Sequence, residues 1–549
     1  MNANDLKRIL IGGKIVGEYF LKTNGPKAVE KSQKIIYHFQ ELVKSFMNLS
    51  QSYQSNTQDH SNSNDSSTEK NHENHKEKDL FGFSSLKNSD RHDKDLLSII
   101  QNQPKVQMRE REVPSTQFQR AMGFGGMASS IGLGIISDRI GNMISGNDSN
   151  QKISDQNAER LAEALCRLRG AALKIGQMLS IQDEEGMLPP ALAKALERVR
   201  QSADYMPAHQ LKVQMMKELG ENWQEKFKSF EMSPIAAASI GQVHRASLHD
   251  GTDVVVKIQY PGVADSISSD LNNLKLLVSS TNLLPTGLFI DEIIKVARTE
   301  LSEECNYTLE LENQVKYKEF IVNDPFIKKH VYVPLVYRDY SSARVLTTEY
   351  IEGVSIDKAV NFSQDIRNAI SRTLLYLTIH ELFVYRFMQT DPNYSNFLYD
   401  HNKFRINLID FGATRSYSKD FVDGYMKLVW AAANSDSETL IGISKKLGFL
   451  TGDESPEMIT AHSKAGMVVG EPFLSNEPYD FSGSMLTTRI GQYGSVFMKH
   501  RLTPPPTEAY SLHRKLAGAF LLCIKLKACI PCRDILESVY KKYNFTSSS

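Results

Sequence analysis

Three oxygen-bearing side chains in one short stretch could carry out phosphoryl chemistry. Asp391 is followed five positions later by Asn396, and an apolar, strand-like run then leads to Asp410, the first residue of an Asp-Phe-Gly sequence. This is the order in which phosphoryl-transfer sites present a carboxylate that orients the attacking group and then two ligands for Mg²⁺. The stretch therefore predicts Asp391 as a catalytic residue and Asn396 and Asp410 as metal ligands.

A lysine that could contact nucleotide phosphates lies well upstream. Lys257 is the one charged residue in the run 254–258, whose other members are valine and isoleucine and predict a buried strand. An unpaired ammonium is costly in such a strand, so a role at the phosphates is favoured over a solvated lysine ending an edge strand. We therefore predict that Lys257 is both catalytic and nucleotide-binding.

A loop of small residues precedes this strand, followed by a strand over 242–247 and an Asp250-Gly251 hairpin turn. Alanine is small enough to let backbone N–H groups approach a phosphate. The loop residues predicted to contact the nucleotide are Ala236, Ala237, Ala238 and Ser239.

A glutamate-rich segment over 291–317 has a long helical pattern. Glu304 and Glu310 are six residues apart, which on a single helix corresponds to about 600° of rotation, so they would point in different directions and serve different partners. Further on, a strand over 344–347 leads into a segment whose backbone groups would bind adenine. Its residues are Thr348, Glu349, Tyr350 and Ile351.

The elements around Asp391 limit the class of acceptor. A long apolar-periodic helix over 364–388 leads to Asp391, and His380 within it is expected to be packed and not catalytic. After Gly412 the chain passes quickly into a helical pattern near 419–433, without an Ala-Pro-Glu sequence. Protein kinases dock their peptide in the segment that is short here, so protein phosphorylation is not expected.

Composition sets the broad class. The chain has 549 residues, 41% of them hydrophobic and 23% charged, which is enough for more than one globular domain. Lys plus Arg and Asp plus Glu both number 64, and no basic block occurs, so we expect no nucleic-acid partner. Five scattered cysteines suit a reducing compartment, and the lone pair Cys529 and Cys532 favours a structural role over zinc or redox chemistry.

The first 150 residues are of three kinds. Residues 6–22 are basic and partly amphipathic, which fits a targeting segment and an ordinary surface helix about equally. Residues 51–79 are almost entirely polar and predict a disordered linker that extends to about 105. Residues 121–137 are uncharged, with Gly126, Ser130 and Gly134 at four-residue spacing, which favours a short membrane or dimer-forming helix over a buried Gly-rich connector.

A helical stretch from 155 carries an apolar stripe and one sequence that does not fit it, Lys174-Ile175-Gly176-Gln177. Together with Asp391 to Asn396 and Asp410-Phe411-Gly412, this tetrapeptide makes the chain resemble the UbiB-type (aarF-domain) atypical kinases. Within that family it most resembles the mitochondrial members required for coenzyme Q biosynthesis. The resemblance extends from about 104 to 532 and also rests on 236–239, 304–307, 387–393 and 501–506. The Lys-x-Gly-Gln motif is highly specific to the family.

The resemblance implies an α+β, two-lobed protein-kinase-like fold with an N-terminal helical extension that covers the active site. It implies that Lys257 pairs with the phosphates and with Glu310. It also implies regulatory contacts from Lys174, Gly176 and Gln177 to Glu304. One departure is Asn306, where the family commonly has an acid.

These expectations divide the chain into six regions. They are an N-terminal helical or targeting region (1–50), a disordered linker (51–105), a Gly-rich membrane or dimerisation segment (106–150), the helical extension (151–230), the kinase-like N-lobe (231–351) and the C-lobe (352–549).

The function implied is that of an atypical kinase or ATPase that binds ATP and Mg²⁺ and supports coenzyme Q (ubiquinone) biosynthesis. Its expected place is the matrix side of the mitochondrial inner membrane, with the biosynthetic complex and lipid or quinone precursors as partners and a homodimer as its assembly. Two alternatives stay open: a small-molecule or lipid kinase, and a nucleotide-binding scaffold without turnover.

Overall fold

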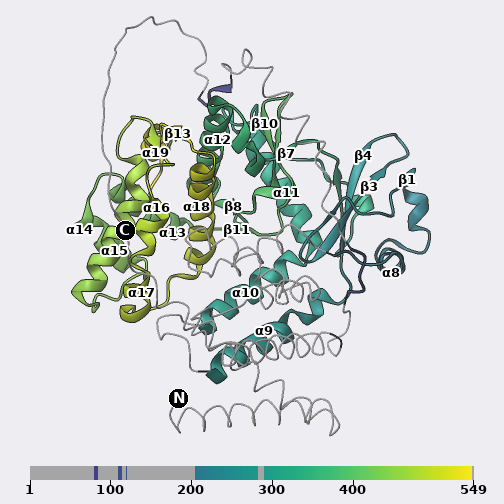
Figure 1. The fold of residues 1–549 in the computed structure, drawn as a ribbon, viewed down its shortest axis with the longest axis horizontal. Helices are drawn as coiled ribbons and strands as arrows, with labels where there is room; N and C mark the ends of the chain where they lie inside the picture. The colour runs from purple at the N-terminus through teal and green to yellow at the C-terminus, as the bar shows by residue number, and fades with distance from the viewer. Residues whose placement is uncertain (1–79, 84–108, 114–118, 120–203, 282–289, 547–549) are drawn as a thin grey trace, which may run out of the picture.

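The computed structural model describes residues 80–83, 109–113, 119, 204–281 and 290–546. These residues form a lobe built around a β-sheet and a larger, mostly helical lobe (Figure 1). Each lobe has its own buried hydrophobic cluster. The architecture is the predicted α+β arrangement of two lobes. The helices predicted around Lys174 and over 121–137 lie outside the described residues.

The sheet of the smaller lobe is antiparallel. Its strands are β1 (Ser229–Phe230), β2 (Ala236–Ala237), β3 (Gly241–Ser247), β4 (Asp253–Gln259) and β6 (Val345–Glu349), in the order β1-β3-β4-β6 with β2 on β3. Along β4, Val254, Val256 and Ile258 are buried in the lobe core, and Lys257 alternates with them onto the opposite face. Gly251 allows the hairpin turn between β3 and β4, with φ of +90°.

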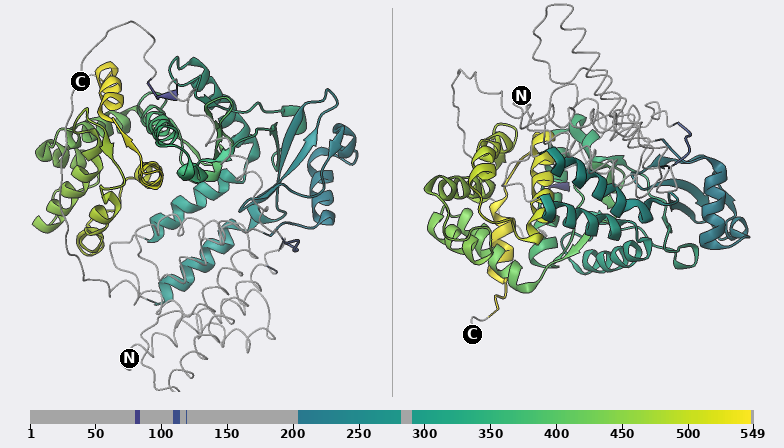
Figure 2. Two further views of the ribbon diagram at one scale, coloured as in Figure 1. Left: turned by 45° about the horizontal axis from the view of Figure 1, so that its top comes forward. Right: turned by 90° about the horizontal axis from the view of Figure 1, so that it is seen from below.

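Helices contribute buried side chains to the core of this lobe. They are α8 (Ala208–Leu219), α9 (Val263–Thr281), α10 (Ile290–Glu304) and α11 (Tyr307–Asn323). α9 and α10 lie side by side in both the first and the turned views (Figure 2). The single helical pattern predicted over 291–317 is wrong, because the chain breaks after Glu304 and α11 starts anew. Asn306 is the N-cap of α11, and its Oδ1 accepts a hydrogen bond from the Leu309 N–H at 3.2 Å.

The larger lobe is built around α12 (Gln364–Phe383), which is buried over most of its length. The prediction extended this helix to 388, but it ends at Phe383, and Arg386 turns the chain with a φ of +50°. The remaining helices are α13 (Lys419–Ala432), α14 (Ser437–Lys446), α15 (Pro456–Gly470), α16 (Leu486–Gly491), α17 (Gly494–His500), α18 (Thr507–Lys525) and α19 (Arg533–Lys542).

Short strands complete the larger lobe and present the loops of the site. One sheet has the order β5-β10-β9-β7, with β5 (Val331–Tyr332), β7 (Val354–Ser355), β9 (Phe397–Asp400) and β10 (Arg405–Leu408). Two pairs stand apart: β8 (Phe387–Gln389) with β11 (Thr414–Ser416), and β12 (Tyr479–Asp480) with β13 (Cys529–Ile530). The β8–β11 pair brings the two ends of the stretch from Gln389 to Thr414 together.

Two short segments near the N-terminus pack against the lobes. Phe81 and Phe83, inside the predicted disordered linker, are buried in the core of the larger lobe, where Phe83 stacks on His330 with ring centroids 4.7 Å apart. For residues 80–83 the prediction of disorder is therefore wrong. Val113 is buried in the core of the smaller lobe. In the described part of the chain, no helix is both long enough and apolar enough to cross a membrane.

Two buried histidines make the stability of the fold sensitive to acid. Burial lowers the pKa of His244 and of His380 to about 4, and His380 stacks on Tyr376 as predicted for a packed residue. Because an unfolded histidine titrates near 6.5, each group contributes stability that is fully present above that pH and is lost as the pH falls toward 4. The contribution is on the order of 3 kcal/mol at most for each group.

We therefore expect the melting temperature of the protein to fall as the pH is lowered from 6.5 to 5. The replacement His380→Gln should flatten this dependence, which thermal unfolding at a series of pH values would measure. Identical pH slopes for the two proteins would contradict the assignment.

Candidate active site

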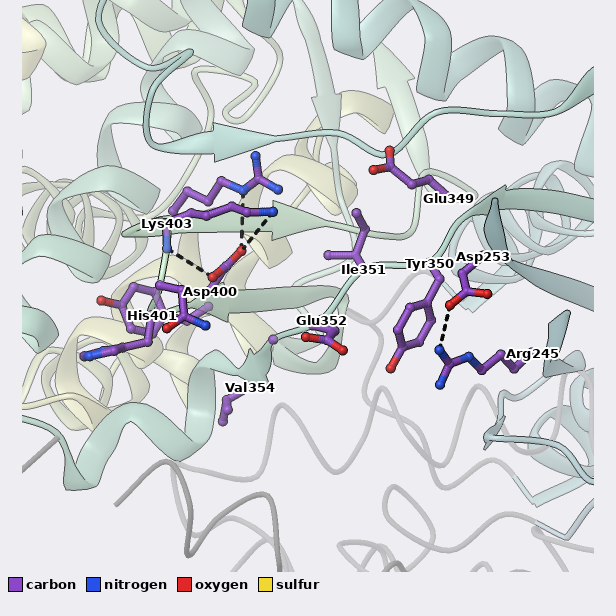
Figure 3. Close-up of a pocket in the computed structure, with 14 residues that line it drawn as sticks. Arg245, Asp253, Glu349, Tyr350, Ile351, Glu352, Val354, Asp400, His401 and Lys403 are labelled. Atoms are coloured by element: carbon purple, nitrogen blue, oxygen red, sulfur yellow. Dashed lines mark hydrogen bonds and ion pairs between the residues drawn. The ribbon is translucent and has the colours of Figure 1, made fainter. Parts of the chain in front are cut away.

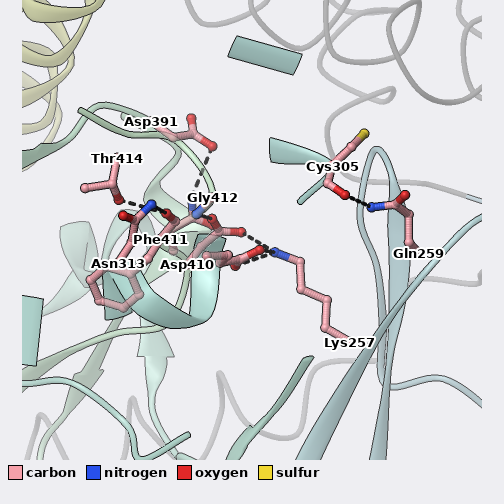
Figure 4. A network of polar contacts seen from close by, with 11 residues as sticks. Lys257, Gln259, Cys305, Asn313, Asp391, Asp410, Phe411, Gly412 and Thr414 are labelled. Carbon is pink, nitrogen blue, oxygen red and sulfur yellow. Dashed lines mark hydrogen bonds and ion pairs between the residues drawn. The ribbon is translucent and has the colours of Figure 1, made fainter. Parts of the chain in front are cut away.

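One lysine and two carboxylates form the centre of the candidate site. The Lys257 Nζ donates to Glu310 Oε1 at 2.7 Å and to Oε2 at 3.0 Å, and to Asp410 Oδ2 at 3.1 Å. Figure 4 shows the lysine side chain extending from β4 to Asp410. Glu310 is on the first turn of α11, so the contact joins the sheet, a helix and the loop after β10. The pairing of Lys257 with Glu310 that the resemblance implied is present.

The charges of this cluster are unequally buried. The side chain of Glu310 is 1% exposed, that of Lys257 14% and that of Asp410 27%. Burial alone would lower the pKa of Lys257, but Asp410 and Glu310 outweigh it and hold this pKa well above its usual value. Burial raises the pKa of Glu310 to about 7, and Lys257 only partly opposes this. Burial of Glu310 beside a second carboxylate therefore favours its protonated form.

The loop that carries Asp391 is held by hydrogen bonds to its carboxylate. The Asn396 Nδ2 donates to Asp391 Oδ2 and the Asn393 N–H donates to Asp391 Oδ1, both at 3.2 Å. A 3-10 helix, Tyr394–Asn396, sets the spacing between the two motif residues. On the other side, the Thr390 N–H donates to the Ala413 carbonyl at 2.8 Å. Figure 4 shows Asp391 on the loop next to Asp410 and Phe411.

Hydrogen bonds also fix the loop after β10, which carries Asp410. The Gly412 N–H donates to Asp410 Oδ1 at 3.0 Å, and the Asn313 Nδ2 donates to the Phe411 carbonyl at 3.3 Å. Phe411 is fully buried against Tyr317. These contacts leave Asp410 pointing toward Lys257 and away from the core.

The donor set fits magnesium bound together with phosphate. Asn396 and Asp410 each offer a side-chain oxygen, the kind of ligand that Mg²⁺ prefers. Within the described residues, no three His, Cys, Asp or Glu side chains form a metal-holding cluster by themselves. Mg²⁺ in nucleotide enzymes needs only one or two protein carboxylates, because phosphate oxygens and water supply the rest. Asn396 and Asp410 are thus suited to a metal that arrives with ATP.

The small-residue loop is a tight turn. Ala236 and Ala237 belong to β2, Ser239 is buried, and the Ala238 N–H donates to the Gly241 carbonyl at 2.7 Å. A Cβ on Gly241 would lie 2.5 Å from the Ile258 carbonyl oxygen, so only glycine fits where the turn enters β3. The Ala238 amide is used inside the turn, which leaves its neighbours as the candidates for phosphate contact.

Three of the four residues predicted to bind adenine, Glu349, Tyr350 and Ile351, line a separate pocket. Thr348 is in β6, Glu349 is its last residue, and the segment that leaves the sheet begins at Tyr350, whose N–H donates to the Asp253 carbonyl at 3.1 Å. A cavity of about 370 Å³ lies between residues 349–354 and the turn 399–403 (Figure 3). The Arg245 guanidinium lies over the Tyr350 ring there, 4.4 Å from its centroid. Lys257, Asp391, Asn396 and Asp410 do not line this cavity.

The acidic end of α10 faces the same centre. A Cβ on Gly412 would lie 3.3 Å from Glu304 Cγ and 3.4 Å from Glu310 Oε2, so both glutamates approach the Asp-Phe-Gly loop. The two glutamates lie on two helices and not on the single helix predicted, because the chain breaks before Asn306, and Glu310 pairs with Lys257. Lys174, Gly176 and Gln177, predicted to meet Glu304, lie outside the described residues.

Asn306, where the chain departs from the family pattern, stabilises the start of α11, and this role can be tested. Because its side chain caps α11, Asn306→Ala should lower the free energy of unfolding by about 1 kcal/mol, the usual loss for an N-cap. Asn306→Asp keeps an accepting oxygen at this position and should unfold as the wild type does. Chemical unfolding would measure both, and equal destabilisation by the two substitutions would contradict the capping role.

Helix α18 adds two cations that sequence reasoning missed. The Arg514 Nη2 pairs with Glu300 Oε2 at 3.0 Å, and the Lys515 Nζ donates to Gln389 Oε1 at 3.1 Å. Lys515 is 126 positions from Gln389 in the sequence, and no local pattern links the two. A basic pair on a strongly amphipathic helix would ordinarily be assigned to a solvated surface, so only the fold reveals this contact.

Comparisons with known proteins agree with this geometry. A family model for the ABC1 atypical kinase-like domain matches residues 198–444, which include Lys257, Glu310, Asp391, Asn396 and Asp410. The chain is 46% identical over 440 residues to the atypical kinase COQ8B, mitochondrial, of Rattus norvegicus, covering 79% of this chain and 82% of that protein. It is 46% identical over 442 residues to the Danio rerio protein of the same name, covering 79% and 70%. It is 40% identical over 445 residues to the atypical kinase COQ8, mitochondrial, of Saccharomyces cerevisiae, covering 80% and 88%.

Proposed function

The chain belongs to the ABC1 atypical kinase family, together with the COQ8 atypical kinases, and from this premise we propose that it uses ATP and Mg²⁺ to support coenzyme Q biosynthesis. The observation that carries the proposal is the convergence of Lys257, Glu310 and Asp410 beside the loop of Asp391 and Asn396. Following the names of its relatives, we assign the protein to mitochondria. Its place on the matrix side of the inner membrane, as a partner of the biosynthetic complex, is part of the same proposal.

Each residue has one task in this proposal. Lys257 contacts the phosphates, and Glu310 holds its ammonium group in place. Asn396 and Asp410 hold Mg²⁺, which neutralises phosphate charge when it is bound. Asp391, fixed through both of its carboxylate oxygens, orients the attacking group. Backbone groups of Ala236, Ala237 and Ser239 remain the proposed contacts to the phosphates, and the segment from Thr348 to Ile351 the proposed contact to adenine.

A small acceptor or water fits the site better than a peptide. β11 begins two residues after Gly412, and α13 begins at Lys419. The described segment between them is too short to form the platform on which protein kinases dock a peptide. This length supports ATP hydrolysis or phosphorylation of a lipid or quinone precursor.

The test is ATP turnover by the purified full-length chain with Mg²⁺, using ATP labelled on its γ-phosphate, with and without lipid vesicles. We expect labelled phosphate or a labelled small molecule from the wild type and neither from Asp391→Asn. A labelled lipid or quinone precursor would favour the small-molecule kinase, and binding without turnover would favour the scaffold. If nucleotide shifts the melting temperature of neither protein, the proposal is wrong.

A further inference from the structure

One face of helix α18 lies against the loop that carries Asp391, residues 389–396, which we call the catalytic loop. Ser511, Lys515 and Gly518 are spaced at three and four residues and so share that face. The Ser511 hydroxyl is 3.2 Å from the Tyr417 hydroxyl, just beyond β11, and Lys515 donates to Gln389. The face therefore follows the two strands, β8 and β11, that bracket the Asp391 loop.

Gly518 provides the second contact to this loop. A Cβ at this position would lie 2.2 Å from the Cβ of Pro392, a distance that no packed atoms tolerate. The helix thus touches the loop at Gln389, two residues before Asp391, and at Pro392, the residue after it. Asp391 is held between the two contacts.

Lys515 is the cation of a buried network that reaches α11, the helix that carries Glu310. Its Nζ is 3.4 Å from Glu381 Oε2 on α12. Glu381 Oε1 accepts from the Gln389 N–H at 2.9 Å and from the Tyr317 hydroxyl at 2.7 Å. Tyr317 is two turns along α11 from Glu310, so a single carboxylate joins α11, α12, α18 and the start of the catalytic loop.

Stability alone does not require these charges. The side chains of Lys515 and Glu381 are 5% and 0% exposed, and removing two charges from water costs several kcal/mol for each ion. Replacing a buried ion pair with well-packed neutral residues is often neutral or stabilising. A buried lysine that donates to the catalytic loop is therefore better explained by the geometry that it imposes.

We propose that α18 positions the catalytic loop, and that Lys515 is the positioning residue that fixes Asp391 for turnover. This inference rests on the proposed ATP-dependent function and adds a structural determinant that lies beyond residues 198–444, outside the part matched by the family model.

The first test replaces the ion pair without leaving a buried charge. The double variant Glu381→Gln/Lys515→Met should fold, keep its nucleotide-dependent shift in melting temperature and keep its KM for ATP. Its kcat should fall by about 10- to 100-fold, the loss expected when a catalytic group moves by up to about 1 Å. The single variant Lys515→Arg, which retains the donor and the charge, should keep most of the wild-type kcat. A folded double variant with wild-type kcat would overturn the proposal.

The second test uses glycine, and the chain offers a matched control. Gly518→Ala should push on Pro392, lower kcat and speed hydrogen exchange at the amides of residues 389–396. Gly442→Ala, on α14, meets nothing within 4 Å and should change neither. Unchanged exchange in Gly518→Ala would overturn the positioning role. If the wild type itself does not turn over ATP, the proposed function fails, while the exchange measurement still decides what α18 does.

Discussion

Asp410→Asn is expected to reduce Mg²⁺-dependent ATP turnover by about 100- to 1,000-fold, because the metal ion contributes several kcal/mol of charge stabilisation and each tenfold in rate is about 1.4 kcal/mol. The substitution is nearly isosteric and removes the negative charge. An asparagine oxygen can still accept the Gly412 N–H that Asp410 Oδ1 accepts at 3.0 Å. The loop should keep its conformation, so the loss is assigned to the metal and not to folding.

Two measurements separate these causes. Asp410→Asn should still unfold in one cooperative transition without nucleotide, because Lys257 keeps its contact with Glu310. The extra stabilisation that Mg²⁺ adds to that of the nucleotide should disappear. Asp436→Asn is the matched control, because Asp436 caps α14 on the exposed surface and asparagine caps equally well. Turnover that persists in Asp410→Asn would remove Asp410 from the metal site.

Lys257→Met is expected to abolish turnover and also to destabilise the protein. It leaves Glu310, with a 1% exposed side chain, beside Asp410 without the shared cation. Breaking a buried ion pair by removing one partner costs about 3–5 kcal/mol, and protonation of Glu310, whose pKa burial already raises to about 7, reduces that cost near neutral pH. The destabilisation should therefore grow as the pH rises above 7, which unfolding at two pH values would measure.

A second substitution separates stability from activity. The double variant Lys257→Met/Glu310→Gln contains neither charge of the pair and should recover most of the lost stability. It should not recover turnover, because no cation then contacts the phosphates. If the double variant regains both, the lysine acts only in folding. If it regains neither, the pair is not the origin of the destabilisation.

Local patterns predicted the parts of the site that lie close together in the sequence. Alternating burial along β4 follows from the valines around Lys257, and the spacing of Asp391 and Asn396 corresponds to one short 3-10 helix. The two residues Asp250 and Gly251 were enough to predict the turn at Gly251. The pairing of Lys257 with Glu310 joins residues 53 positions apart, and it came from the family resemblance and not from any pattern.

The errors arose where one residue changed the local structure or where distant segments meet. Asn306 begins a new helix through its side-chain cap, so the glutamates before and after it approach the same loop. Phe81 and Phe83 form a small apolar island in a polar stretch, and its burial depends on a core built by later residues. The contact of Lys515 with Gln389 depends on the whole helical lobe, and no window of sequence contains both residues.

The central claim is that the Asp391 site supports coenzyme Q synthesis through ATP chemistry. Its most direct test is the coenzyme Q content of cells that lack their own COQ8 relative and express either this chain or its Asp391→Asn variant at equal levels. We expect the wild-type chain to restore coenzyme Q, and the variant to leave its biosynthetic precursors accumulated. Equal restoration by the variant would contradict the claim, because the site would then be dispensable for the function assigned to it.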